Sequence, residues 1–210
     1  FIGTGLKRDE GEFVGDCSDI DDIIVFRRDG KMLIKRVESK AFVGKDIIHA
    51  AVWKKDDKRT IYNMIYGDGK KGGAMMKRFA VTAITRDKEY DLTKGTAGSE
   101  VLHFSANPNG EAEVVTIHLR ALERLKKLKY DLDFAELAIK GRDAGGNVAS
   151  KYPVKRVELK QAGISTLGAR KIWLDESVMR LNEEGHGRFL GDFNAEDKIL
   201  CVLASGVYKL

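Results

Sequence analysis

The clearest pattern along the chain is a pair of short apolar runs joined by a turn-forming stretch. In the first copy, residues 23–26 lead into a turn at Asp29 and Gly30, and residues 31–37 follow it. Short runs of β-branched and aromatic residues on either side of a glycine turn are typical of β-hairpins. This segment therefore predicts a hairpin.

The same arrangement recurs along the chain. The further copies pair residues 61–65 with 75–79, 101–104 with 114–119, 134–139 with 154–157, and 199–203 with 207–210. Aligning them places a basic residue at one repeated position, occupied by Arg36, Arg78, His118, Arg156 and Lys209. A period of about 40 residues is typical of four-stranded blades. We therefore expect an all-β, propeller-like array of about five four-stranded blades.

The stretches between these hairpins predict further strands, with two exceptions. Apolar runs at 47–53, 80–84 and 172–174 are strand-like. In residues 119–128 a leucine recurs every third position among basic residues, which predicts a short helical turn before an alternating strand at 128–134. The segment 176–182 is too short to assign.

The amino-acid composition indicates only the general class of the protein. The 210 residues include 37 basic and 32 acidic side chains, which give a net charge of +5 and favour a polyanionic partner only mildly. Two cysteines, Cys17 and Cys201, make no disulfide framework and fit a reducing cytoplasm. No apolar run is long enough to span a membrane. We expect one domain over residues 1–210, excised from a longer protein because it opens on Phe1 and stops within a strand pattern.

The sequence contains no recognisable catalytic or metal-binding motif. The four histidines are scattered without partner ligands, and the acidic residues Asp19, Asp21 and Asp22 do not complete a calcium loop. We therefore expect neither an independent enzyme nor a metal site in this chain.

Three Lys-Arg pairs recur within the repeat and are the main candidates for binding. In an array of blades, equivalent cations form a ring that contacts the phosphates of a bent duplex without reading its sequence. The alternative is that each pair only solvates an outer strand. Trp53, Trp173, Phe79 and Phe104 lie in apolar runs and are expected in the core. The candidate DNA-contacting residues are Arg27, Arg28, Lys31, Lys35, Arg36, Lys70, Lys71, Lys77, Arg78, Lys155, Arg156, Arg170, Lys171 and Lys209.

Four segments of the chain resemble the C-terminal domain found in the A subunits of bacterial type IIA topoisomerases. They are GDCSDIDDIIVFRRDGK, KRFAVTAITRDKEYDLTKG, SANPNGEAEV and LKQAGISTLGARKIW. The resemblance implies a β-pinwheel, whose blades exchange strands and whose basic edge binds and bends double-stranded DNA. It further implies that the domain presents DNA to a separate core holding the catalytic tyrosine, and that the partner is a B subunit. ATP and Mg would act on other domains of the parent enzyme, and this domain would hold no cofactor. The resemblance also implies that the protein lies in the bacterial cytoplasm, at the nucleoid.

Within that family, the sequence favours a topoisomerase IV-like protein over a supercoiling gyrase. Gyrases carry a glutamine followed by basic residues and a double glycine, and Gln161 here is followed by Ala162 and Gly163 without the basic pair. The stretch 70–73 has a similar composition but lacks the glutamine. A gyrase wrapping domain and a protein-interaction propeller remain the alternatives, the latter supported by the modest net charge.

Overall fold

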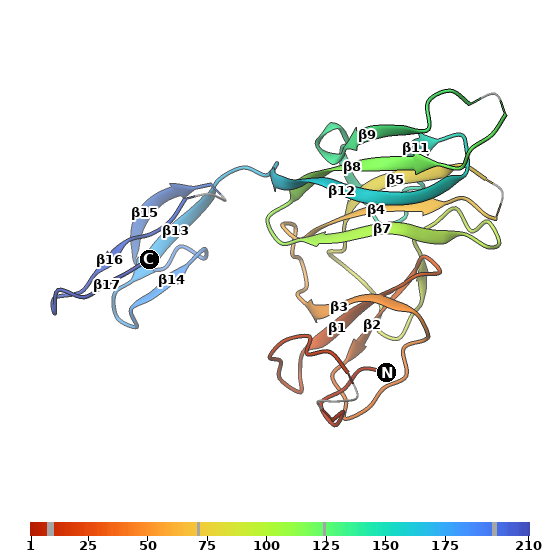
Figure 1. Cartoon of the computed structure of the whole chain (residues 1–210). Coiled ribbons are helices and arrows are strands. Elements are labelled where there is room, and N and C mark those ends of the chain that lie inside the picture. The colour runs from red at the N-terminus through yellow and green to blue at the C-terminus, as the bar shows by residue number, and fades with distance from the viewer. Residues whose placement is uncertain (8–10, 71, 124, 195–196) are drawn as a thin grey trace. The chain divides into compact units, whose positions relative to one another are not determined.

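The computed structural model describes residues 1–7, 11–70, 72–123, 125–194 and 197–210, and these residues are almost entirely strand, turn and loop. The all-β prediction is confirmed. The chain divides into two compact units, unit 1 over Phe1–Gly163 and unit 2 over Ile164–Leu210, which we describe separately (Figure 1). In the described residues no helix is long and apolar enough to cross a membrane.

The first sheet of unit 1 is built on the first predicted hairpin. Its strands run in the order β3-β1-β2-β6. Gly30 closes the turn with a φ of 78° and donates its backbone N–H to the Arg27 carbonyl at 3.1 Å. Such a positive φ is readily adopted by glycine. The bounds are β1 (Asp22–Arg27), β2 (Lys31–Arg36), β3 (Ile47–Trp53) and β6 (Tyr90–Asp91).

The second sheet is built on the second predicted hairpin, β4–β5. Strand β7 pairs with the free edge of β4, while β10 and β11 both pair with β5. The sheet therefore receives strands from far along the chain. The bounds are β4 (Ile61–Gly67), β5 (Ala74–Ala80), β7 (Glu100–Asn107), β10 (Ile139–Gly141) and β11 (Asn147–Ser150).

The third sheet has the order β12-β8-β9, and its central hairpin is β8–β9. The third and fourth predicted hairpins are therefore wrong. The turn at residues 107–110 carries the chain from one sheet to the next, because β7 pairs with β4 and not with β8. The bounds are β8 (Glu111–Leu119), β9 (Lys129–Asp133) and β12 (Val154–Ser165), with a 3-10 turn, η1 (Phe134–Glu136), after β9.

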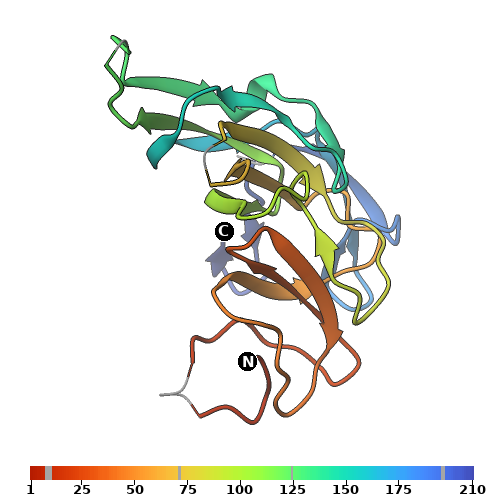
Figure 2. The same ribbon diagram turned by 90° about the vertical axis from the view of Figure 1, so that its right-hand side faces the viewer.

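The three sheets of unit 1 share one plan, with strands exchanged between neighbours. A hairpin lies at the centre, and the next long strand pairs with the hairpin's first strand, as β3, β7 and β12 do. In the first two sheets a strand then returns from beyond the following hairpin to cover the second hairpin strand, as β6 covers β2 and β10 and β11 cover β5. This plan is consistent with the pinwheel expectation. Figure 2 shows the sheets of unit 1 following one another in chain order.

Unit 2 contains a sheet of order β14-β13-β15 and the predicted final hairpin, β16–β17. The strand predicted at 172–174 is confirmed within β13, and the segment 176–182 is a turn leading into β14. That the whole chain forms one domain, and how many blades it has, stay predictions. The bounds are β13 (Arg170–Asp175), β14 (Arg180–Asn182), β15 (Arg188–Phe193), β16 (Cys201–Val202) and β17 (Tyr208–Lys209).

Two local predictions need correction. The described residues of 120–128 are not helical but form a loop that enters β9, so the predicted helical turn is wrong. The alternating strand predicted at 128–134 is confirmed as β9. Of the strand predicted at 80–84, only Ala80 is extended in a sheet, because β5 ends there.

The core of unit 1 lies between successive sheets. Alternate side chains of β1 face opposite ways, so that Ile24 and Phe26 pack toward the second sheet while Ile23 and Val25 pack on the other face. The second sheet is covered on both faces, with Met64 in one cluster and Ile65 in the next. Of the aromatics expected in the core, Phe79 is fully buried, and Trp53 and Phe104 pack against the same cluster.

Candidate nucleic-acid interface

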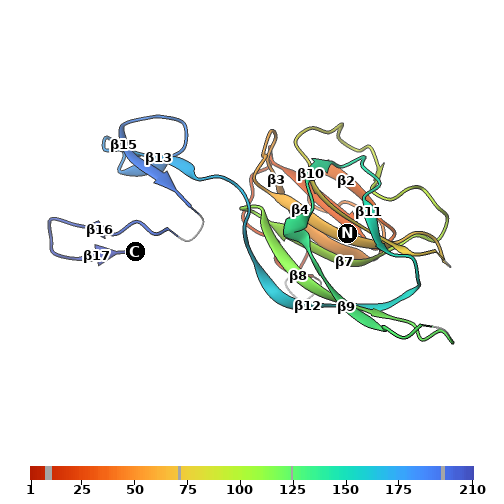
Figure 3. The same cartoon turned by 90° about the horizontal axis from the view of Figure 1, so that it is seen from above.

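Unit 1 carries a basic depression at one end of the third sheet. Its volume is about 540 Å³. Strand β8 ends there, β9 and β12 begin there, and residues 126–128 of the loop before β9 line one side. Figure 3 shows β8, β9 and β12 side by side. Its cationic side chains are Lys126, Lys127, Lys129, Lys155 and Arg156, with His118 beside them.

Backbone pairing fixes the walls of this depression. His118 lies opposite Lys129 in the β8–β9 register. The Leu119 N–H donates to the Leu128 carbonyl at 2.8 Å, and the Arg120 N–H donates to the Pro153 carbonyl at 3.0 Å. The basic loop and the start of β12 are therefore both tied to the end of β8.

The depression has more positive charge than its carboxylates balance. Glu158 lies 3.0 Å from Arg156 and 2.6 Å from the Nε2 atom of His118. In the part of the chain that the structure describes, the four lysines Lys126, Lys127, Lys129 and Lys155 have no carboxylate within 4.0 Å. Like charges concentrated in one hollow raise the local potential and attract a polyanion.

The predicted cations near the first hairpin differ because carboxylates surround them. Arg27 lies 2.8 Å from both Asp29 and Glu89, and Lys31 lies 2.7 Å from Glu89. A hydrogen bond to Asp29 raises the pKa of Arg27, and a hydrogen bond to Glu89 raises the pKa of Lys31. Lys35 is likewise paired with two carboxylates. These charges are largely balanced within the protein.

Lys77 and Arg78 lie in the interior, which corrects their expected place on a basic edge. They are only 3% and 2% exposed because both faces of β5 are covered. Lys77 Nζ donates to the carbonyls of Leu92, Arg142 and Ala144 at 2.6–2.8 Å, and burial lowers its pKa to about 8. A charge held this way joins β5 to neighbouring loops and is not available to DNA.

Arg78 belongs to a buried polar network between the second and third sheets. Its Nε donates to the Asn63 side chain at 3.1 Å, and the Asn63 amide donates to Glu113 at 2.6 Å. Glu113 also accepts from Ser105 at 2.6 Å and lies 2.9 Å from Nε2 of His103. Although burial pushes the pKa of Glu113 upward, its hydrogen bonds with His103, Ser105 and Asn63 hold it below its usual value.

The other predicted residues are spread over the surface. Arg28, Arg36 and Lys70 are exposed on unit 1, with Arg28 4.0 Å from Glu100, and Lys71 lies outside the described residues. On unit 2, Lys171 and Lys209 are exposed and Arg170 pairs with Glu183 at 2.9 Å. Of the thirteen candidates that the structure describes, only Lys155 and Arg156 line the basic depression.

The expected ring of equivalent cations is not formed by the residues that were aligned. Arg36 and Arg78 lie on second hairpin strands, whereas His118 lies on the first strand of its hairpin and Arg156 on the strand that pairs beside it. His118 and Arg156 nonetheless meet in the basic depression.

Sequence reasoning missed Lys126, Lys127 and Lys129, although the signal was present. Basic residues crowd the stretch 119–129, but its leucine at every third position predicts a helical turn and gives no sign of a binding surface. Within the described ranges, no three His, Cys, Asp or Glu side chains lie close enough together to hold a metal ion.

Comparison with known proteins places most of the chain, including nearly all of unit 1, in a described family. A family profile described as the topoisomerase C-terminal domain of Bacteroidota matches residues 1–162. The chain is also similar to the A subunit of DNA topoisomerase 4 from Borreliella burgdorferi, with 30% identity over 161 residues. That match covers 76% of this chain and 24% of the relative, so the chain spans about a quarter of the relative's length.

Proposed function

Because the chain belongs to the C-terminal domain family of bacterial type IIA topoisomerase A subunits, we propose that unit 1 binds double-stranded DNA through the phosphates, at the basic depression. The observation that carries the proposal is the cluster of four lysines and Arg156 in one hollow with few balancing carboxylates. Contacts to phosphates position a protein on DNA without reading sequence. Binding is therefore tolerant of sequence.

The test is a salt series of fluorescence-anisotropy titrations with a labelled duplex. Neutralising Lys126, Lys127 and Lys155 together to glutamine removes up to three phosphate contacts. Since each contact contributes about 0.9 to the slope of log K against log salt, the slope becomes less steep by roughly 2 to 3.

The matched control makes the same charge change elsewhere on unit 1. Lys54, Lys55 and Lys58 are exposed in the loop between β3 and β4, and their joint replacement by glutamine leaves the slope nearly unchanged. Equal losses in the two triple variants would show that only net charge matters and would refute the proposed site. No binding by the unaltered protein at low salt would refute DNA binding itself.

The similarity to a DNA topoisomerase 4 subunit supports a finer proposal about the role of the domain. We propose that the domain bends the bound duplex and presents it to the strand-passage core of a topoisomerase IV-like enzyme, in which the B subunit is the partner and ATP and Mg act on other domains. The similarity to the A subunit of DNA topoisomerase 4 supports this assignment over a gyrase.

Ligation of nicked circles with the protein bound distinguishes these two roles. Simple bending leaves the distribution of topoisomers almost unshifted, whereas gyrase-like wrapping gives a marked positive shift. The second result would contradict the topoisomerase IV-like assignment. The proposed cellular location is the bacterial cytoplasm, at the nucleoid.

A further inference from the structure

An apolar depression of about 340 Å³ adjoins the basic one on unit 1. The two share Leu119 and Lys127, so they meet at the end of β8, where the basic one lies on the His118 face of the β8–β9 hairpin and the apolar one on the Tyr130 face. Phosphate contacts to a duplex account for the lysines, but they leave the apolar walls without a role. The volume lies at the small end of the range for ligand sites, roughly 300–1,000 Å³, and suits one planar group better than a duplex.

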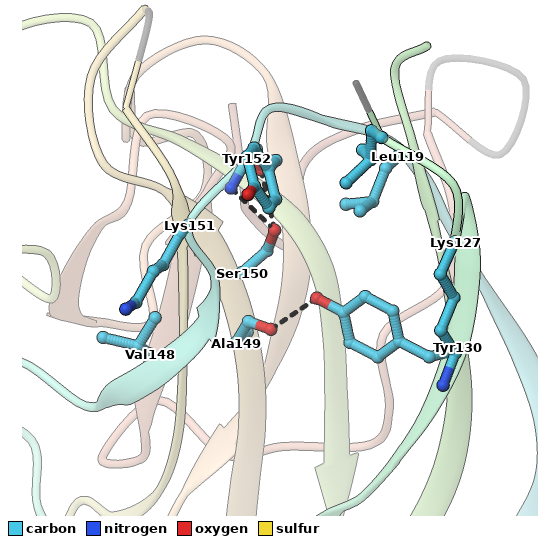
Figure 4. Close-up of a pocket in the computed structure, with 9 residues that line it drawn as sticks. Leu119, Lys127, Tyr130, Val148, Ala149, Ser150, Lys151 and Tyr152 are labelled. Atoms are coloured by element: carbon cyan, nitrogen blue, oxygen red, sulfur yellow. Dashed lines mark hydrogen bonds between the residues drawn. The ribbon is translucent and has the colours of Figure 1, made fainter. Parts of the chain in front are cut away.

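Two tyrosines line this apolar depression (Figure 4). The Tyr130 hydroxyl donates to the Ala149 carbonyl at 2.6 Å, which ties β9 to β11. The Tyr152 backbone N–H donates to the Ser150 hydroxyl at 2.9 Å, and that hydroxyl donates back to the Tyr152 carbonyl at 2.8 Å. Pro153 restricts the backbone of Tyr152 further. The Tyr130 ring and the Tyr152 backbone are thus held in place before any ligand arrives.

The remaining walls combine apolar groups with cations at the rim. Leu119, Leu125 and Val148 supply aliphatic surface, and Val148 is 60% exposed. Lys127 lies at one side, with its Nζ 5.9 Å from the centre of the Tyr130 ring, and Lys151 lies at the other. Aromatic platforms beside cations are the arrangement on which unpaired nucleic-acid bases stack.

We propose that the apolar depression takes one unpaired base, whose flanking phosphates lie in the basic depression. The inference rests on the proposed DNA binding and adds a substrate class, DNA that carries an extrahelical or single-stranded nucleotide. The base stacks at Tyr130 and Tyr152, while Lys127 faces both the base and the phosphate. The competing occupant is an acidic peptide that contains an aromatic residue. Unlike a nucleic acid, such a peptide has no charged backbone, so its negative charges lie only on its acidic side chains.

The experiment compares three fluorescein-labelled probes by anisotropy: a fully paired duplex, the same duplex with one extrahelical thymidine, and the same bulge with an abasic nucleotide. The thymidine bulge binds at least about 5-fold more tightly than the abasic bulge, the lower end of what one stacked base contributes. Tyr152→Ala removes this preference and leaves affinity for the paired duplex unchanged, because the exposed Tyr152 ring touches only the unpaired base.

A second variant keeps the inference testable if Tyr152→Ala unfolds. Val148→Glu places a carboxylate in the apolar wall and also abolishes the preference, whereas Ile20→Glu, at another exposed position, makes the same charge change and retains it. Equal affinity for the thymidine and abasic bulges would overturn the inference.

Two further outcomes separate this inference from the proposed function. Binding of the paired duplex with no effect of the extra base would leave the proposed function standing and overturn only the base site. Failure of all three probes to bind would refute both. Displacement of the thymidine bulge by an acidic, phenylalanine-containing peptide as effectively as by unlabelled bulge DNA would favour a peptide and overturn the inference.

Discussion

The buried carboxylate of Glu113 makes a quantitative prediction about the stability of unit 1. The side chain is 5% exposed and interacts with Asn63, Ser105 and His103 at 2.6–2.9 Å. Its charge also opposes the lowering of the Arg78 pKa by burial. Glu113→Gln keeps the shape but replaces one acceptor oxygen with a donor and removes that charge.

The expected cost has two parts. A hydrogen bond to a charged group contributes about 1.5–3 kcal/mol, and removing one partner of a buried charged pair costs roughly 3–5 kcal/mol. Because glutamine retains one acceptor, we expect a loss of about 3 kcal/mol. At roughly 2–4 °C per kcal/mol for a chain of this size, the melting temperature of unit 1 falls by about 6–12 °C.

The two tryptophans allow unit 1 to be followed by itself. Trp53 lies in unit 1 and donates its indole N–H to the Val81 carbonyl at 2.8 Å, while Trp173 lies in unit 2. In a Trp173→Phe background, urea and thermal unfolding followed by fluorescence therefore report unit 1. Glu136→Gln, a change at an exposed carboxylate, is the control and leaves stability within about 0.5 kcal/mol.

The same variant predicts a change in acid sensitivity. The folded state lowers the pKa of Glu113 below its ordinary value of 4.5, so unfolding takes up a proton in acid. The stabilisation is present above pH 4.5 and is lost as the pH falls through the folded pKa. Glu113→Gln removes this part of the acid loss. A variant that matches the unaltered protein both at neutral pH and in acid would refute the reasoning.

Two further predictions concern single contacts in unit 1. Tyr130→Phe removes the 2.6 Å hydrogen bond to Ala149 and lowers the free energy of unfolding in urea by about 1 kcal/mol. Tyr152→Phe changes an exposed ring and leaves the free energy of unfolding unchanged. Equal effects of the two substitutions would contradict the role of the Tyr130 hydrogen bond. Gly30→Ala destabilises by about 1–2 kcal/mol in the same assay, because φ is 78° and the new Cβ would lie 2.3 Å from Thr93 Cγ2. Adding Thr93→Ser, which lacks that methyl group, recovers part of the loss, and no recovery would show that backbone strain alone matters.

The local sequence pattern predicts where the strands lie better than it predicts which strands pair. The first, second and last hairpins were predictable because each pairs two strands that follow one another in the sequence across a glycine-containing turn or loop. The third failed at residues 107–110, where an equally good turn connects two sheets. Turn chemistry specifies that the chain reverses, but which strand it then pairs with depends on packing between distant segments.

The candidate site shows the same limit. The repeat points to Lys155 and Arg156, and it points equally to Lys77 and Arg78. The repeat does not reveal that β5 is covered on both faces, which places its cations inside. The repeat also does not predict that the loop before β9 lies beside the start of β12, since that contact depends on the backbone hydrogen bond from Arg120 to Pro153.

The exchange of strands between sheets limits how unit 1 can be divided or assembled. A fragment ending after β9 would contain every strand of the second hairpin, yet the edge of β5 would be bare, because β10 and β11 come from beyond that point. A nascent chain faces the same delay, since the second sheet cannot be completed until residue 150 has emerged from the ribosome. Long-range pairing of this kind slows folding and leaves an unpaired strand edge exposed meanwhile. Truncated forms that preserve the second sheet therefore need to extend through β11.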